Sequence, residues 1–195
     1  MEAAPIFCAG FTVYSGLRDA ELLPGERCAV IGVGGLGHLA VQYAGALGGE
    51  VFVVTRSPDK TKSLKAMGAE HVVVAGSDEV GASLERVGGV GVMLHSGNAI
   101  DPDLLRGLRP YGRLSLTGVS DSPLTTTPLQ MIFGNRRIVG SSQGPRQRLP
   151  EVLELHRRAR VKTLVETYSL DEALTAYERV ASGTARFRAV LVPES

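Results

Sequence analysis

Short apolar runs alternate with helical stretches along most of the chain, and this alternation limits the possible folds more than any other feature. Most of the runs are continuously apolar, which is typical of strands covered on both faces. Strands that alternate with helices predict parallel β-α-β units, and therefore an α/β fold with a doubly wound parallel sheet. The runs predicted to be strands are Cys28–Val33, Val51–Thr55, His71–Ala75, Val90–Leu94, Arg113–Gly118, Ile138–Ser141 and Arg188–Val192.

The stretches between these runs have the ends expected of helices. Serine or aspartate before proline supplies an N-cap and a favoured first helical residue, and glycine favours a helix end. A tract rich in Ser, Thr and Pro, Ser120–Pro128, instead predicts a surface loop near the strand ends. Helices are predicted over 36–47, after Ser57-Pro58, after Asp101-Pro102, over Leu149–Ala159 and after a capping box of Ser169 and Glu172.

The composition is that of a soluble globular protein, with 44% hydrophobic and 21% charged residues. The 21 Lys and Arg residues against 20 Asp and Glu give a net charge of +1, so we expect neither nucleic acid nor an anionic membrane as a partner. Two cysteines, Cys8 and Cys28, are too few for a disulfide framework. No run approaches the roughly 18 apolar residues of a spanning helix, and the first residues do not resemble a signal peptide, so we expect a cytoplasmic protein.

A glycine-rich loop, Gly32–Gly37, joins the first apolar run to the first helix after it. In a dinucleotide-binding turn, a glycine placed like Gly32 permits the tight turn, one placed like Gly34 admits the pyrophosphate, and one placed like Gly37 lets the helix pack closely. The helix N-terminus supplies N–H groups and a partial positive charge for the phosphates. The loop, including Gly35 and Leu36, is therefore predicted to bind a dinucleotide; the alternative is a tight strand-to-helix turn without a ligand.

The end of the second run indicates which dinucleotide is bound. An NAD site places an Asp or Glu about 20 residues after the first glycine, where it accepts hydrogen bonds from the ribose. Here the run ends in Thr55, Arg56 and Ser57, and Asp59 is assigned to the first turn of the next helix. Arg56, with Thr55, Ser57 and Lys60 nearby, suits a 2′-phosphate, unless it is an ordinary surface arginine. We therefore expect NADP(H) in preference to NAD(H).

Several segments resemble a known family. Gly32–Ala44, preceded by Leu23-Pro24-Gly25-Glu26, resembles the cofactor domain of zinc-containing, medium-chain alcohol dehydrogenases, most closely their NADP-dependent, cinnamyl-alcohol-dehydrogenase-like branch. Ala4–Tyr14, Leu108–Arg113 and Ala185–Val192 resemble further segments of the same family. The resemblance implies a Rossmann fold and hydride transfer between a nicotinamide cofactor and a small alcohol or aldehyde.

The resemblance also implies roles for individual residues. Cys8 matches the third ligand of the family's catalytic zinc, and Thr12, one helical turn on, matches a catalytic residue beside the nicotinamide. His38 follows the glycine-rich loop in the first turn of the helix, where the alternatives are an approach to the phosphate and an outward-facing surface imidazole; we expect the second. Residues His95–Asn98 are expected to line the cleft at another strand end. The remaining positions with implied contacts to the cofactor are His95, Thr117, Gly118, Val119, Ser141, Ser142 and Arg188.

The chain departs from the family's pattern in one respect. Family members carry a β-rich catalytic domain ahead of this segment, and that domain holds the other ligands of the catalytic zinc. A catalytic zinc needs about three protein ligands, and this chain offers Cys8 alone. We therefore expect zinc only where the catalytic domain is supplied, and binding of NADP(H) without appreciable alcohol turnover by this chain.

The same resemblance predicts the domain organisation. Residues 1–22 are expected to form a helix linked to the catalytic domain, 23–160 the dinucleotide-binding domain, and 161–195 a segment that returns toward the catalytic domain. Without that domain, the last segment must pack on the sheet or pair with another chain. Family members dimerise through the edge of the sheet, so we expect a homodimer through Ile138–Ser141.

Two other functions remain open. One is a zinc-independent enoyl or quinone reductase of the same superfamily, against which Cys8 and the Gly34–Gly37 sequence argue. The other is a dinucleotide-binding module without catalysis. The identity of the alcohol or aldehyde cannot be predicted, because the residues that shape its pocket belong mainly to the catalytic domain.

Overall fold

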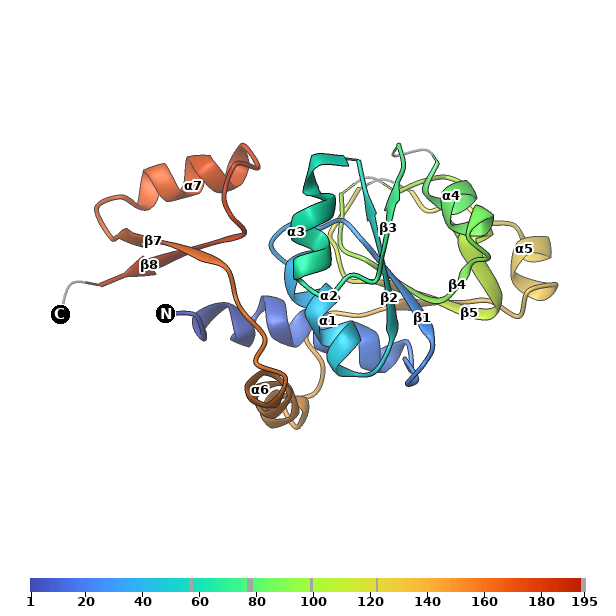
Figure 1. The fold of residues 1–195 in the computed structure, drawn as a ribbon, viewed down its shortest axis with the longest axis horizontal. Coiled ribbons are helices and arrows are strands. Elements are labelled where there is room, and N and C mark those ends of the chain that lie inside the picture. Colours follow the sequence, from blue (N-terminus) through green and yellow to red (C-terminus); the bar gives the residue numbers. More distant parts are fainter. Residues whose placement is uncertain (57, 77–78, 99, 122, 194–195) are drawn as a thin grey trace.

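The computed structural model describes residues 1–56, 58–76, 79–98, 100–121 and 123–193. Six strands form one parallel sheet in the order β3-β2-β1-β4-β5-β6 (Figure 1). This order is that of the doubly wound Rossmann fold, so the predicted fold class is confirmed. The strands are β1 (Arg27–Ile31), β2 (Glu50–Thr55), β3 (His71–Val74), β4 (Val90–His95), β5 (Leu108–Leu116) and β6 (Arg137–Gly140).

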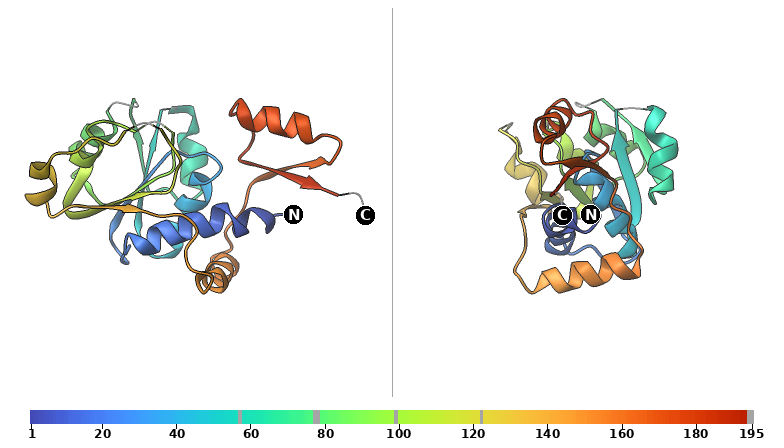
Figure 2. Two further views of the ribbon diagram at one scale, coloured as in Figure 1. Left: turned by 180° about the vertical axis from the view of Figure 1, so that it is seen from behind. Right: turned by 90° about the vertical axis from the view of Figure 1, so that its left-hand side faces the viewer.

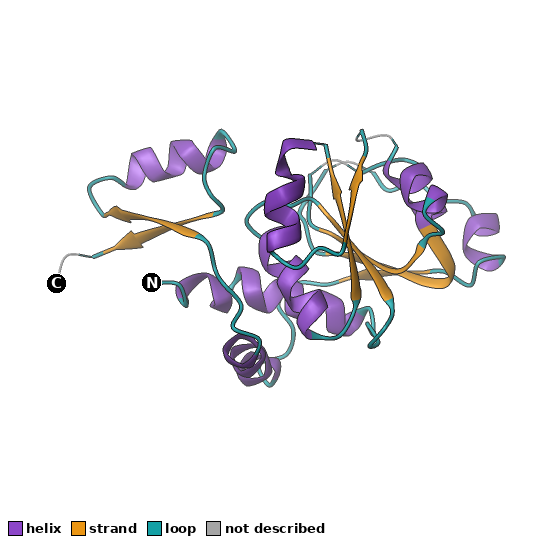
Figure 3. Cartoon of the chain, in the orientation of Figure 1, coloured by secondary structure: helices purple, strands orange, loops and turns teal. Residues whose placement is uncertain are grey.

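Helices cover both faces of this sheet (Figure 3). One face packs against α1, α2, α3 and α6, and the other packs against α4 and η3, each through its own apolar cluster. This arrangement explains why the central strands consist of continuous apolar runs. The α-helices are α1 (Ala9–Asp19), α2 (Gly37–Ala46), α3 (Thr61–Ala66), α4 (Val80–Arg86), α5 (Pro128–Ile132), α6 (Arg148–Arg158) and α7 (Ala173–Ala181), and the 3-10 helices are η1 (Ala4–Phe7), η2 (Pro58–Lys60) and η3 (Leu104–Gly107).

The last part of the chain forms a separate β-α-β unit, called here the C-terminal unit (residues 165–192). Its strands β7 (Val165–Ser169) and β8 (Arg188–Val192) pair in parallel with each other, and α7 connects them. Two views show this unit beside the six-stranded sheet and not stacked on it (Figures 1 and 2). Of the two expected alternatives, stacking on the sheet is not seen in the described residues, where β7 and β8 satisfy each other's backbone groups; pairing with another chain stays a prediction.

Some elements differ from those predicted. The helix expected after Asp101-Pro102 is only the short η3, which ends where Leu108 already adopts the extended backbone of β5. The buried Asp101 carboxylate accepts the N–H groups of Gly81 and Asp103 at 2.7 and 2.8 Å. The tract predicted as a loop ends in α5, whose N-cap Thr127 forms a capping box with Gln130. Strand β7 and helix α4 were not predicted. The N-cap predicted at Ser57 lies outside the described residues.

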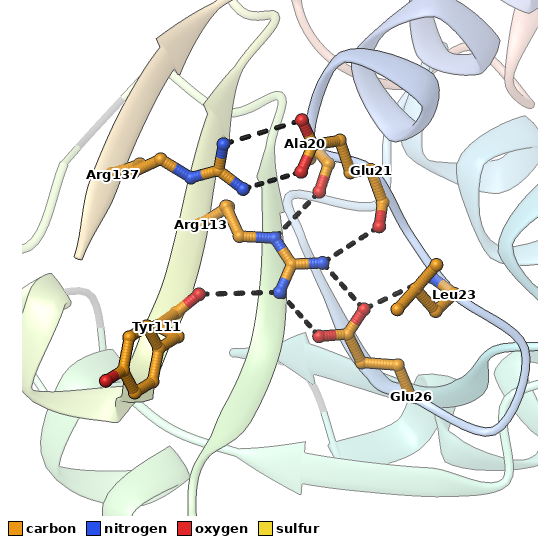
Figure 4. A network of polar contacts seen from close by, with 7 residues as sticks. All are labelled: Ala20, Glu21, Leu23, Glu26, Tyr111, Arg113 and Arg137. Atoms are coloured by element: carbon orange, nitrogen blue, oxygen red, sulfur yellow. Dashed lines mark hydrogen bonds and ion pairs between the residues drawn. The ribbon is translucent and has the colours of Figure 1, made fainter. Parts of the chain in front are cut away.

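A buried arginine fixes α1 to the sheet (Figure 4). Arg113 of β5 donates to both carboxylate oxygens of Glu26 at 2.6 and 2.7 Å, and to the carbonyl oxygens of Ala20 and Glu21 at 2.8 and 2.9 Å. Ala20 and Glu21 directly follow α1, and Glu26 directly precedes β1. Arg113 therefore anchors the C-terminal end of α1 and the start of β1 to β5. The N-terminal end of α1 lies toward the carboxyl edge of the sheet.

Candidate functional site

Three glycines bring the loops after β1, β4 and β5 into contact at the carboxyl edge of the sheet. A Cβ placed on Gly32 would lie 2.8 Å from the backbone nitrogen of Gly97, and one on Gly118 would lie 2.8 Å from the Gly97 carbonyl oxygen. The Ser96 hydroxyl donates to the Gly32 carbonyl at 2.8 Å. Open α/β sheets bind their ligands at this edge, where the strand order reverses. The sequence predicted roles here for Gly32 and Gly118, and it placed Ser96 and Gly97 in the range His95–Asn98 expected to line the cleft; the close packing of Gly97 against Gly32 and Gly118 was not predicted.

The glycine-rich loop has the shape that a phosphate cradle requires. Gly32 adopts φ +88°, a left-handed conformation that other residues rarely adopt. A side chain on Gly37 would overlap the Gly32 carbonyl oxygen, so the start of α2 packs directly on the turn. At Gly34, which is exposed, an added Cβ would meet nothing within 4 Å. The loop is thus tightly packed below and open above.

The N-terminus of α2 faces this open side. Its N-cap, Leu36, makes no side-chain capping hydrogen bond. The unpaired N–H groups of a helix N-terminus carry a partial positive charge and favour anions. Loop and helix together therefore offer backbone donors to a diphosphate without contributing a full charge.

A full positive charge comes from the C-terminal unit. Arg188, the first residue of β8, places a guanidinium nitrogen 2.8 Å from the position that a Cβ on Gly35 would occupy. The residue before it, Phe187, stacks on His38 with 4.9 Å between ring centroids and 16° between planes. His38 is fully buried, so the predicted surface imidazole is wrong. Desolvation by burial lowers the pKa of His38 to about 4, which leaves the ring neutral at pH 7.

The end of β5 lies beside the end of β4. The backbone N–H groups of Thr117 and Gly118 donate to the His95 carbonyl at 3.0 and 3.2 Å, and the Thr117 hydroxyl donates to the same oxygen at 3.1 Å. The His95 side chain is buried, whereas Val119 is 91% exposed. A cleft of about 560 Å³ opens here, lined by Asn98, Val119, Ser120, Asp121 and Pro123.

The end of β2 is more open. Thr55 is half-buried, and Arg56 and Lys60 are exposed. Ser57, predicted to contribute to this part of the site, lies outside the described residues. Thr55 and Arg56 place a hydroxyl and a cation where an NAD site would have a carboxylate.

Helix α1 brings two more of the predicted residues toward the site. Cys8 is exposed immediately before α1, and the N–H of Thr12, one turn on, donates to its carbonyl at 2.8 Å. Another turn on, Gly16 packs against the Thr117 side chain. Thr12 lies one helical turn before Gly16, on the same side of α1, which is the side that contacts the end of β5.

The two serines predicted after β6 have different surroundings. The Ser141 hydroxyl donates to the Asp19 carboxylate at 2.7 Å, which holds the last turn of α1, and Ser142 is exposed. Ser141 therefore has a structural partner, whereas Ser142 faces the solvent.

A catalytic zinc does not fit the described residues by themselves. Among them, no group of three His, Cys, Asp or Glu side chains is arranged to hold a metal ion. Cys8 would contribute a single thiolate, which is fewer than the three protein ligands of a catalytic site.

In the part of the chain that the structure describes, no helix is long and apolar enough to cross a membrane.

The chain is similar in sequence to known dehydrogenases. Residues 35–158 match the family model described as "Zinc-binding dehydrogenase". Over 191 residues, the chain is 36% identical to a protein of Oryza sativa subsp. japonica named "Probable cinnamyl alcohol dehydrogenase 3", covering 96% of this chain and 52% of that protein. The chain therefore spans about half the length of the curated relatives it matches.

Solved structures show the same similarity. A cinnamyl alcohol dehydrogenase of Sorghum bicolor superposes with a TM-score of 0.85 and 30% identity, covering 97% of this chain and 54% of that chain. The CAD of Helicobacter pylori, complexed with NADP(H), superposes with a TM-score of 0.80 and 27% identity, again covering 97% of this chain and 54% of that chain. Both similarities extend over the six-stranded sheet and the C-terminal unit.

Proposed function

This chain belongs to the zinc-binding dehydrogenase family, and on that premise we propose that it is the NADP(H)-binding part of an alcohol dehydrogenase. The observation that carries the proposal is the glycine-rich loop, which is open above Gly34 and has the Arg188 guanidinium beside Gly35. Backbone donors, a helix N-terminus and a forked cation converge there, as a diphosphate requires. A bound nicotinamide would supply the hydride acceptor or donor for an alcohol or aldehyde.

The other residues at this edge have roles in holding the cofactor. The backbone of Thr117, Gly118 and Val119 follows β5, where it can bind the carboxamide beside the open cleft. Thr12 contributes a hydroxyl from α1, and a side-chain hydroxyl can donate to or accept from the reacting oxygen. The buried His95 at the end of β4 and the exposed Ser142 after β6 complete the proposed set of cofactor contacts.

The binding step is tested by placing a side chain above the loop. Gly34→Val fills space that is empty in the folded protein, so we expect an unchanged melting temperature and at least a 100-fold loss of NADPH affinity by calorimetry. Gly45→Ala in the middle of α2 is the matched control, because its Cβ meets only the Val51 side chain at 3.7 Å. Equal NADPH binding by Gly34→Val and the wild type would contradict the proposed site.

The preference for NADP(H) is tested at Arg56. Its guanidinium can pair with the 2′-phosphate that distinguishes NADPH from NADH. We expect Arg56→Ala to weaken NADPH binding by roughly 10- to 100-fold and to leave NADH unchanged, since a charge-assisted hydrogen bond contributes about 1.5–3 kcal/mol. Arg109→Ala, an exposed arginine at the start of β5, is the control. Wild-type affinity for NADH equal to that for NADPH would overturn the preference.

Catalysis and assembly complete the proposal. The chain alone is expected to bind NADPH but to turn over benzyl-type or aliphatic alcohols negligibly, because Cys8 cannot hold zinc without further ligands. Robust turnover, or stoichiometric zinc in the pure protein, would contradict this.

We also propose a homodimer through β6, the edge strand next to β5; a strictly monomeric species by light scattering at high concentration would exclude it. Both cysteines are free, which suits a reducing compartment such as the cytoplasm.

A further inference from the structure

A pair of stacked rings joins the C-terminal unit to the glycine-rich loop. His38 belongs to the first turn of α2, and Phe187 directly precedes β8. Their ring centroids are 4.9 Å apart and nearly parallel, and the His38 ring is fully buried. The contact therefore links two segments that are far apart in the sequence and belong to different sheets.

The same histidine also holds the loop. Its Nδ1 lies 3.3 Å from the Gly34 carbonyl oxygen, and its backbone N–H donates to that oxygen at 3.2 Å. With the proton on Nδ1, a neutral imidazole donates to Gly34 and presents its face to Phe187. Fixing the Gly34 carbonyl also fixes the direction in which the neighbouring N–H groups of the loop point.

Phe187 and Arg188 both lie against the glycine-rich loop. The Phe187 carbonyl oxygen and the Arg188 guanidinium both lie against Gly35, at 3.1 and 2.8 Å from the Cβ position built there. An arginine side chain has many rotamers, and restricting them before a ligand binds reduces the entropy lost on binding. A ring anchored one residue earlier restricts the backbone from which this arginine extends.

We propose that Phe187 and His38 are positioning residues for nucleotide binding, whose stack keeps the Arg188 guanidinium over the glycine-rich loop. The inference rests on the proposed function and adds that the C-terminal unit contributes to nucleotide affinity through this contact. By linkage, a bound nucleotide stabilises the docked position of β8 by the same free energy.

The test is a double-mutant cycle with NADPH as the probe, measured by calorimetry. Arg188→Ala is expected to weaken binding by about 10- to 100-fold, the effect of one lost charge-assisted contact. Phe187→Leu, which keeps apolar bulk without the ring, is expected to weaken it several-fold, and Phe187→Tyr to restore it. Because Phe187 acts through Arg188, the double variant Phe187→Leu/Arg188→Ala is expected to bind no more weakly than Arg188→Ala alone.

Controls separate this inference from a general effect and from the proposed function. Tyr177→Leu removes an exposed aromatic ring from the same unit and is expected to leave affinity unchanged. Two outcomes overturn the inference alone, provided that the wild type binds NADPH. One is a Phe187→Leu variant with wild-type NADPH affinity, and the other is a double variant whose loss of affinity equals the sum of the two single losses. Failure of the wild type to bind NADPH or NADH overturns the proposed function.

A second measurement needs no substitution. Saturation with NADPH is expected to slow amide hydrogen exchange in β8 by several-fold, because the docked state of that strand gains stability. Exchange in the C-terminal unit that is indifferent to bound NADPH overturns the inference, whatever the variants show.

Discussion

Replacing Arg113 by methionine tests the packing that carries α1 to the site. The Arg113 side chain is 10% exposed and holds the Glu26 carboxylate, whose side chain is 19% exposed. Methionine retains apolar volume but supplies no donor. After the change, the Leu23 N–H at 3.2 Å remains as a donor to Glu26, and the Ala20 and Glu21 carbonyls lose their donor (Figure 4).

The expected loss follows from these contacts. Removing one member of a buried ion pair costs about 3–5 kcal/mol, because the other charge stays buried without an opposite charge. We therefore expect Arg113→Met to lower the free energy of unfolding by about 4 kcal/mol in urea denaturation followed by circular dichroism. Arg113→Met/Glu26→Met removes the uncompensated charge as well, so its loss is expected to be smaller than the sum of the two single losses.

An exposed ion pair in the same network is the matched control. Arg137 contacts Glu21 at 2.7 Å, but their side chains are 53% and 63% exposed. Solvent screens such a pair, so Arg137→Met is expected to cause a much smaller loss than Arg113→Met. Similar losses for the two variants would refute the reasoning that burial gives the Arg113 contacts their weight.

Two glycine substitutions in α2 test the packing of that helix, and a substitution of His38 tests how pH changes the free energy of unfolding. Gly37→Ala would overlap the Gly32 carbonyl oxygen and is expected to cost about 3 kcal/mol or more in urea denaturation, whereas a loss below 1 kcal/mol would contradict that packing. Gly45→Ala, inside α2 with room for the methyl group, is expected to raise stability by about 0.5–1 kcal/mol, and a lower melting temperature would contradict this. His38, with its pKa lowered from 6.5 to about 4, stays neutral while the unfolded chain takes up a proton, so stability falls as the pH drops from 6.5 to 4, by about 3 kcal/mol. His38→Phe is expected to remove this part of the acid sensitivity; equal pH dependence of wild type and variant in urea denaturation would exclude it.

The six-stranded sheet could be predicted because its buried strands are continuous apolar runs in the local sequence. Every strand of that sheet overlaps one of the predicted apolar runs, and the central strands β1, β2 and β4 are almost wholly buried. Strand β7 was not predicted because it lacks such an apolar run. It is only partly buried, and its sequence Val165–Ser169 contains only two apolar residues, Val165 and Tyr168, with no continuous apolar run.

Other features depend on contacts that no local pattern contains. His38 resembles a surface residue in its own helix, and only the fold brings Phe187 over it. Gly97 was expected only to line the cleft, within His95–Asn98, because its close contacts come from two neighbouring loops, which meet over it at Gly32 and Gly118. By contrast, the capping box of Thr127 and Gln130 was a readable signal for α5, obscured by the Ser, Thr and Pro residues around it.

Nucleotide binding and metal binding place different demands on this edge of the sheet. A diphosphate needs backbone donors and one cation, and these come from the glycine-rich loop and from Arg188, two segments joined by a ring stack. A catalytic zinc needs three side chains at fixed distances, and Cys8 satisfies only one of these positions. Under the proposed function, the described residues supply the donors and the cation for the diphosphate but not the three ligands for zinc, so we expect cofactor affinity and alcohol turnover to be separable in this chain.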